Sequence, residues 1–231
     1  MRRLLKLAVL LGAAVGLYQA GAMANNAPMP TPPTASGVSA PAMTPMDWAR
    51  EAYNSGVSHK DKAAKLEVQA EKQAAKDRDK TLGKAKDEYG KAFKDFKKAA
   101  DLVPELHQAY NGMGFAYRKM GDYPKALEMY DKALQLAPGF PDALEYRGEA
   151  YLGLNRVDDA KQAYLALFAR DRAQADQLMK AMQTWVEKRQ ADPAGADPAA
   201  VSSLDAWIKE RAKVAAVTIE MGLSSEHAAW K

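Results

Sequence analysis

Residues 107–140 read HQAYNGMGFAYRKMGDYPKALEMYDKALQLAPGF, and residues 141–174 read PDALEYRGEAYLGLNRVDDAKQAYLALFARDRAQ. Each segment is 34 residues long, and the two keep small, aromatic and turn-forming residues at matching positions. A period of this length is typical of stacked helical hairpins, in which each hairpin buries its apolar face against its neighbours. The sequence therefore predicts an all-α hairpin solenoid with flanking helices.

The matching positions hold three kinds of residue. In the first segment they are Tyr110, Met113, Gly114, Tyr117, Gly121, Asp122, Ala126, Tyr130, Ala133 and Pro138. In the second they are Leu144, Arg147, Gly148, Tyr151, Asn155, Arg156, Ala160, Tyr164, Leu167 and Arg172. We expect the glycines and alanines to let paired helices approach closely, and the tyrosines to fill the space between hairpins. Gly121 and Asn155 tolerate the left-handed backbone that ends a helix.

This pattern resembles the tetratricopeptide repeat family, whose helical hairpins stack into superhelices with a concave binding surface. The second segment departs from the family pattern at Arg147, Leu167 and Arg172, as terminal repeats do. Upstream, the second helix of a partial repeat is indicated by Tyr89, Ala92, Phe96, Ala99 and Pro104. The core sites expected for its first helix are occupied instead by Lys76, Asp79, Lys80 and Gly83. The resemblance implies repeats over residues 87–172, one partial and two full.

Residues 1–24 have the composition of a secretory signal. Three basic residues accompany an apolar run over residues 4–17 that is too short to span a bilayer comfortably. Small residues at its end fit cleavage after Ala24, and the alternative is an uncleaved N-terminal anchor. No cysteine follows the run, which excludes a bacterial lipoprotein anchor.

The charge of the chain is close to balanced once the signal is removed. Of 33 basic residues three lie in the signal, which leaves 30 basic residues against 29 acidic ones. This balance gives no argument for nucleic acid or anionic lipid as a partner. The chain has no cysteine and no Asn-x-Ser/Thr acceptor site. We therefore expect a protein of the bacterial periplasm, without stable membrane insertion after cleavage.

Two segments precede the repeats. Residues 25–45 are rich in Pro, Ala, Thr, Ser and Met and carry no charge, which predicts a disordered tether. Residues 46–86 are predicted to be a charged helical segment, with Asp47 as its cap and Trp48 and Tyr53 as buried anchors. Its apolar stripe is thin, so we expect a solvated helix, with a dimerising coiled coil as the alternative.

Two segments follow the repeats. Residues 173–190 are expected to form a capping helix, with an apolar face made of Leu178, Met182, Trp185 and Val186. Residues 191–231 are predicted to form a further helix that ends at Gly222, with helical spacing of Leu204, Ile208, Ala215 and Ile219. Because short arrays are only marginally stable alone, we expect this helix to fold back on the repeats.

The sequence offers no constellation for catalysis, and we predict no enzyme, cofactor or metal site. His59, His107 and His227 belong to separate elements and have no nucleophile or helical zinc motif beside them. The pairs Met43/Met46 and Met179/Met182 have the spacing of thioether copper ligands. The preferred interpretation is that the first pair straddles the tether and that the second lies on a packed apolar stripe, where methionine readily fills irregular spaces.

The resemblance implies that the first helix of each hairpin presents side chains to a ligand in the concave groove. The residues expected there are Gln108, Asn111, Phe115, Arg118, Asp142, Glu145 and Glu149. Some family members clamp a C-terminal carboxylate at such positions, but Phe115 and Glu149 stand where that clamp needs amides. The groove is better suited to an extended or helical segment that carries apolar and basic residues.

We therefore predict a non-catalytic scaffold or adaptor of the bacterial cell envelope that binds a segment of another protein. The first alternative is a structural protein that self-associates into a homo-oligomer through its charged and C-terminal helices. The second is an accessory subunit of an envelope enzyme that binds a small ligand.

Overall fold

The computed structural model describes Met29, residues 42–193 and residues 195–228, with side chains described as far as residue 213. The described residues contain eight α-helices and no strand, which confirms the predicted all-α class. The helices are α2 (Pro45–Glu71), α3 (Ala75–Leu102), α4 (His107–Lys119), α5 (Tyr123–Leu136), α6 (Pro141–Gly153), α7 (Val157–Phe168), α8 (Arg172–Ala191) and α9 (Pro198–Ala228).

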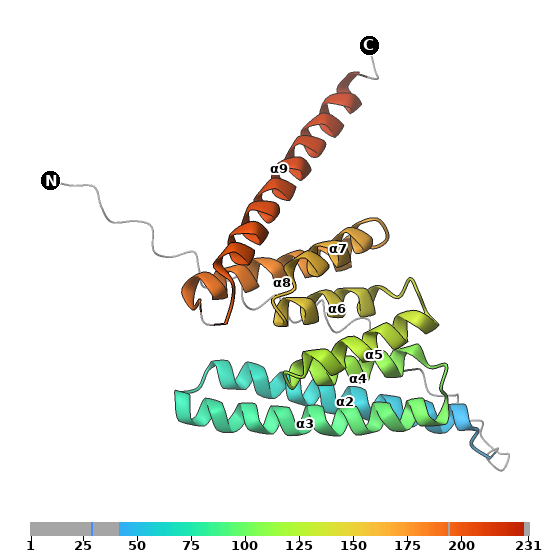
Figure 1. The fold of residues 1–231 in the computed structure, drawn as a ribbon. Helices are drawn as coiled ribbons and strands as arrows, with labels where there is room; N and C mark the ends of the chain where they lie inside the picture. The colour runs from blue at the N-terminus through green and yellow to red at the C-terminus, as the bar shows by residue number, and fades with distance from the viewer. Residues whose placement is uncertain (1–28, 30–41, 194, 229–231) are drawn as a thin grey trace.

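The helices form hairpins that stack in chain order (Figure 1). Helices α2 and α3, α4 and α5, and α6 and α7 are paired, and α8 and α9 are also in contact. Contacts further join α2 to α4, α4 to α6, and α6 to α8. The first helices of successive hairpins are therefore neighbours, and together they form one continuous face of the stack.

Close packing inside the hairpins depends on glycine. A Cβ atom added to Gly114 of α4 would lie 2.6 Å from the Tyr130 ring of α5. In the preceding hairpin the Phe96 ring lies against both Gly56 of α2 and Gly112 of α4, at 2.7 Å from a Cβ on either. The predicted left-handed turns are also confirmed, because φ is +87° at Gly121 and 59° at Asn155. Glycine thus sets the distance between helices in two successive hairpins.

The prediction for the charged segment is corrected by a turn at residues 72–74, which divides it between two long helices. The first helix of the upstream hairpin is α2, whereas Lys76, Asp79, Lys80 and Gly83 are exposed residues in the first turns of α3. Gly114 precedes Tyr130 by 16 residues, but Gly56 precedes Phe96 by 40. The same contact between a glycine and an aromatic ring therefore occurs in a hairpin of longer helices. Because these helices are longer, the two residues do not have the spacing of the 34-residue repeat.

The start of α2 also differs from the prediction. Thr44 is the N-cap, and Asp47 is the third helical residue of a capping box in which each side chain bonds the other residue's backbone. Tyr53 is a buried anchor as expected, with 2% of its surface exposed. Trp48 is not an anchor, because 45% of its surface is exposed.

The C-terminal helices close the array. On α8 the residues Leu178, Met182 and Val186 are buried against α6 and α7, as expected of a capping helix. On α9 the residues Val201, Leu204 and Ile208 join the same core. The rest of α9 extends away from the stack (Figure 1), so the helix folds back only through its first turns. It continues past Gly222 to Ala228, which corrects the predicted end.

Several predictions concern residues outside the described part of the chain. The signal over residues 1–24 and its cleavage after Ala24 are among them, and so is the tether over residues 25–45 apart from Met29 and residues 42–45. The side chains of Ala215, Ile219 and His227 are likewise not described. Among the described helices, none has both the length and the apolar character needed to cross a bilayer.

Candidate partner-binding face

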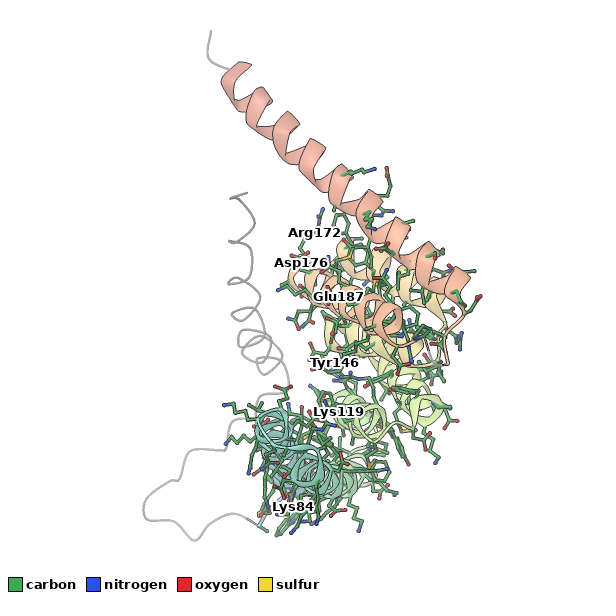
Figure 2. All side chains as sticks on the ribbon, turned by 90° about the vertical axis from the view of Figure 1, so that its left-hand side faces the viewer. Lys84, Lys119, Tyr146, Arg172, Asp176 and Glu187 are labelled. Carbon is green, nitrogen blue, oxygen red and sulfur yellow. The ribbon has the colours of Figure 1, made fainter. Side chains whose placement is uncertain are left out.

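The face formed by α2, α4, α6 and α8 brings the predicted groove residues together. We call its centre the inner face and define it by Lys60, Asn111, Phe115, Arg118, Asp142, Glu145 and Glu149. Figure 2 views the stack from the left-hand side of Figure 1, and there the labelled Lys119 of α4 lies next to Tyr146 of α6. Six of the seven predicted residues belong to this centre, and Gln108 lies one turn before Asn111 on α4.

Arg118 and Glu149 link two neighbouring hairpins by an ion pair between α4 and α6. The guanidinium carbon of Arg118 lies 5.1 Å from the ring centroid of Phe115 and 5.1 Å from that of Tyr146. Burial alone would lower the pKa of Arg118, but the carboxylates of Glu149 and Glu145 raise it above its usual range. Arg118 is therefore a permanently charged group held between aromatic rings.

Phe115 is the aromatic centre of the inner face. Its ring meets Tyr89 of α3 at 6.0 Å and Tyr146 of α6 at 5.2 Å, in both cases edge to face. The ammonium group of Lys60 on α2 lies 5.7 Å from the same ring. Because Phe115 is only partly buried, it is the apolar side chain of this face that a ligand could reach first.

Two carboxyl groups of α6 are almost fully buried, since Asp142 and Glu145 each expose 2% of their surface. Asp142 accepts a hydrogen bond of 3.1 Å from Gln174 of α8. Burial raises the pKa of Glu145 well above its usual range, and the neighbouring Glu149 adds to the effect. Burial also lowers the pKa of Lys60, against the attraction of Asp61 and Asp142. The inner face thus holds buried polar groups on the same helices as its aromatic rings.

Asn111 is the inner-face residue whose two side-chain polar atoms both lack a partner among the described residues. It is 0% exposed, and neither Nδ2 nor Oδ1 has a hydrogen-bond partner. One buried carboxylate oxygen, Oε2 of Glu145, is in the same condition. A buried polar atom without a partner costs about 1–3 kcal/mol, so these atoms retain unused capacity to bind a polar ligand.

The burial differs from what the sequence suggested. The prediction placed these side chains at a surface where each would be either in solvent or on a ligand, but Asn111, Asp142 and Glu145 are internal. Their role in binding a partner stays a prediction.

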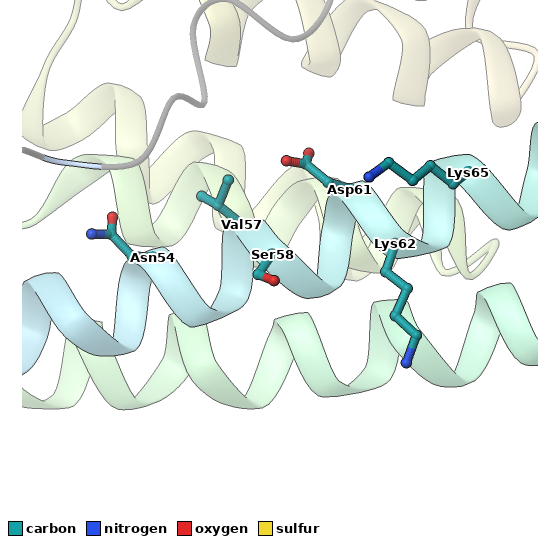
Figure 3. Close-up of a pocket in the computed structure, with 6 residues that line it drawn as sticks. All are labelled: Asn54, Val57, Ser58, Asp61, Lys62 and Lys65. Atoms are coloured by element: carbon teal, nitrogen blue, oxygen red, sulfur yellow. The ribbon is translucent and has the colours of Figure 1, made fainter.

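A second feature, which the sequence did not reveal, is a cleft along α2. It has a volume of about 470 Å³ and is lined by Asn54, Val57, Ser58, Asp61, Lys62 and Lys65. Val57, Asp61 and Lys65 project to the same side of the helix (Figure 3). The cleft adjoins the inner face, because Lys60 of the same helix lies over Phe115. The repeat spacing gave no signal for this hairpin, because Gly56 precedes the Phe96 ring that it contacts by 40 residues rather than 16.

The structure also gives His59 acidic neighbours that its sequence context lacked. Nδ1 of His59 lies 2.6 Å from Glu88 of α3, and Nε2 lies 3.9 Å from Asp95. Glu88 also accepts hydrogen bonds from Lys62 and Lys91, which makes the cluster an ionic connection between α2 and α3. Within the described residues, no group of three His, Cys, Asp or Glu side chains is arranged to hold a metal ion.

The remaining histidine and methionine predictions are resolved by packing. His107 stacks edge to face on Phe140 at 4.8 Å, and burial lowers its pKa. Met43 and Met46 are 44% and 43% exposed, whereas Met182 is fully buried in the core that Met179 borders. Met179 and Met182 are therefore core residues, as preferred.

This is an all-α helical-repeat protein, because its helices form stacked hairpins and the first helices of these hairpins share one face. Glycines set the distance between the paired helices. In a comparison with known families, residues 107–140, which include α4 and α5, match the family model described as "Tetratricopeptide repeat".

Two further comparisons were made. Among solved structures, the chain is similar to the one entitled "First TPR of Spaghetti (RPAP3) bound to HSP90 peptide SRMEEVD". The identity is 20%, the similarity covers 56% of this chain and 92% of that chain, and the TM-score is 0.38. No curated protein matches the chain.

Proposed function

We propose that this protein is a non-catalytic scaffold of the bacterial cell envelope that binds a segment of another protein on its inner face. The tetratricopeptide repeat and the all-α repeat fold support an interaction scaffold. Repeat arrays of this kind offer an extended surface made of successive first helices, which suits a segment better than a small molecule.

The observation that carries this proposal is the unsatisfied amide of Asn111. A peptide backbone offers one donor and one acceptor per residue. These match the Oδ1 acceptor and the Nδ2 donor of the Asn111 side-chain amide. Phe115 lies one helical turn after Asn111 on α4, so a segment that displaces the partly buried Phe115 ring would approach this amide. The acidic groups then favour a segment with basic and apolar residues, in extended or helical form.

Site-specific photo-crosslinking tests this function. A photo-crosslinking residue at the exposed Lys65, which lines the cleft, is compared with one at the exposed Lys132 on α5. We expect one partner protein to be joined at Lys65 in envelope extracts and not at Lys132, and to be lost in the variant Asn111→Leu. Equal amounts of crosslinked product at both positions would reject the inner face as the binding site. So would a crosslinked product that still forms in Asn111→Leu when the thermal stability of this variant is unchanged.

The envelope location is supported by the N-terminal sequence pattern. N-terminal sequencing of the protein from fractionated bacteria tests it. We expect a periplasmic protein that begins at Asn25. A protein that begins at Met1 and fractionates with the cytoplasm would contradict this part of the proposal and leave the scaffold function standing.

A second candidate function is self-association, and the geometry of α9 favours it. This helix extends beyond the turns that pack on α8 (Figure 1). Light scattering at low and high salt separates the two candidates. A charge-linked oligomer should dissociate as salt screens it, whereas a monomeric scaffold should not change in mass.

A further inference from the structure

A residue from before α2, Met29, contacts Asn54, which lines the α2 cleft. The backbone N–H of Met29 donates a hydrogen bond of 2.7 Å to Oδ1 of Asn54. Nδ2 of Asn54 in turn donates a hydrogen bond of 3.0 Å to the carbonyl oxygen of Met29. One side-chain amide thus pairs with both backbone groups of a single residue, which is the way that a receptor recognises a peptide backbone independently of its side chain.

The Met29 side chain adds an apolar contact to this pairing. It packs against the core cluster of the first hairpin, to which Tyr53 and Val57 of α2 belong. Tyr53 and Val57 are adjacent in space to Asn54, and Val57 also lines the cleft. Recognition of Met29 therefore has two parts, a pairing of amides and a partly buried thioether side chain.

The sequence around Met29 suits such a docked segment. Met29 stands between Pro28 and Pro30, so it supplies the only N–H group of that tripeptide, and Asn54 accepts it. Proline fixes its own φ angle and biases the preceding residue toward extended conformations. A segment of this kind loses little conformational entropy when it docks.

Connection to the same chain makes a weak contact effective. Only 15 residues separate Met29 from Pro45, the first residue of α2. A short connection gives an effective concentration on the order of millimolar, so a contact with a dissociation constant in that range is populated in cis. A contact of this strength remains open to displacement by a ligand.

We propose that the N-terminal segment around Met29 is an intramolecular ligand of the α2 cleft, held through Asn54, and that it competes with partner segments for this end of the binding surface. The competing segment has the same chemistry, an extended backbone with an apolar side chain between prolines. The regulatory part rests on the proposed scaffold function, but the docking of Met29 does not. In the protein without a partner, the segment around Met29 therefore occupies the Asn54 end of the cleft.

Methyl NMR of the full chain with labelled methionines tests the docking directly. The Met29 signal is assigned from the variant Met29→Leu and compared between the wild type, Asn54→Leu and the control Glu51→Gln, an exposed position on the same helix that does not line the cleft. We expect a Met29 methyl signal displaced by the nearby rings in the wild type and in Glu51→Gln, and a signal typical of a free chain in Asn54→Leu. A free-chain signal in the wild type would overturn the proposal.

A peptide of residues 27–33, APMPTPP, tests the competition. Its affinity is measured by titration of the wild type, of Met29→Asp and of the double variant Met29→Asp/Asn54→Leu. We expect binding to Met29→Asp about tenfold tighter than to the wild type, because the wild-type site is occupied in cis. We also expect this gain to vanish in the double variant. Equal affinity for the wild type and Met29→Asp would overturn the proposal. Because neither test needs a partner protein, their failure would be distinct from failure of the scaffold function.

Discussion

Arg118 of α4 and Glu149 of α6 form an ion pair that connects two successive hairpins, with the guanidinium between the rings of Phe115 and Tyr146. The pair lies at the centre of the face on which the sequence predicted a ligand. Its side chains are only 12% and 22% exposed, so removal of one member leaves a charge in a desolvated place. Two residues predicted to bind a partner therefore also hold the hairpins together.

The first prediction concerns this ion pair. The variant Glu149→Ala leaves Arg118 buried without its carboxylate and should lower the free energy of unfolding by about 3 kcal/mol. Replacement of both members, in Arg118→Met/Glu149→Leu, should recover most of that loss because no charge remains buried. Urea unfolding followed by far-UV circular dichroism measures both, with the exposed Glu187→Ala as a control. A loss in Glu149→Ala no larger than in the control would contradict the structural role.

The second prediction compares two glycines within helices. In Gly114→Ala the new Cβ meets the Tyr130 ring at 2.6 Å, so α4 and α5 must separate and stability should fall by about 1–3 kcal/mol. In Gly83→Ala nothing lies within 4 Å of the new Cβ, and the higher helix propensity of alanine should raise stability by about 0.5–1 kcal/mol. Thermal unfolding of the two variants decides the matter. Changes of the same sign would show that Gly114 does not set the helix distance.

The third prediction concerns acid stability. Hydrogen bonds from Lys91, Lys62 and His59 lower the pKa of Glu88 from 4.5 to about 2. A carboxyl group whose pKa is lower in the folded state stabilises the protein above its unfolded pKa, and the contribution disappears as pH falls through the folded pKa. Acidification from about pH 5 to pH 2 should therefore remove the stabilisation that Glu88 provides.

The measurement is the melting temperature as a function of pH. In Glu88→Gln the decrease between about pH 5 and pH 2 should be smaller than in the wild type, because the titrating group is gone. Asp79→Asn serves as the control, since that side chain is 75% exposed. Parallel curves for the wild type and Glu88→Gln would rule out a stabilising role of this cluster.

The fourth prediction tests the docking of α9. Leu204 is 0% exposed in the core shared by α7, α8 and α9, so Leu204→Ala should cost about 2–5 kcal/mol of stability. Leu165 of α7 is 40% exposed, and Leu165→Ala should change stability by less than about 1 kcal/mol. Chemical unfolding of both variants provides the comparison. Similar small effects would indicate that α9 does not stabilise the array.

The repeat hairpins could be predicted because their information is local. Gly114, Tyr130 and the left-handed turn at Gly121 all lie within one 34-residue segment. Each of these features depends on residues of the same hairpin. The first hairpin could not be predicted in the same way. Its Gly56 and Phe96 make the same contact, but longer helices place them outside the 34-residue register.

The sequence by itself determined the all-α class, the two tetratricopeptide-like hairpins and the identity of the residues on their first helices, because helical periodicity and turn chemistry are written in neighbouring residues. Only the tertiary structure decided that Asn111 and Glu145 are buried without full hydrogen bonding, that His59 meets Glu88, and that Met29 docks on Asn54. These relationships join residues from different helices and from a segment before them. Their geometry follows from how the hairpins stack, which no local pattern specifies.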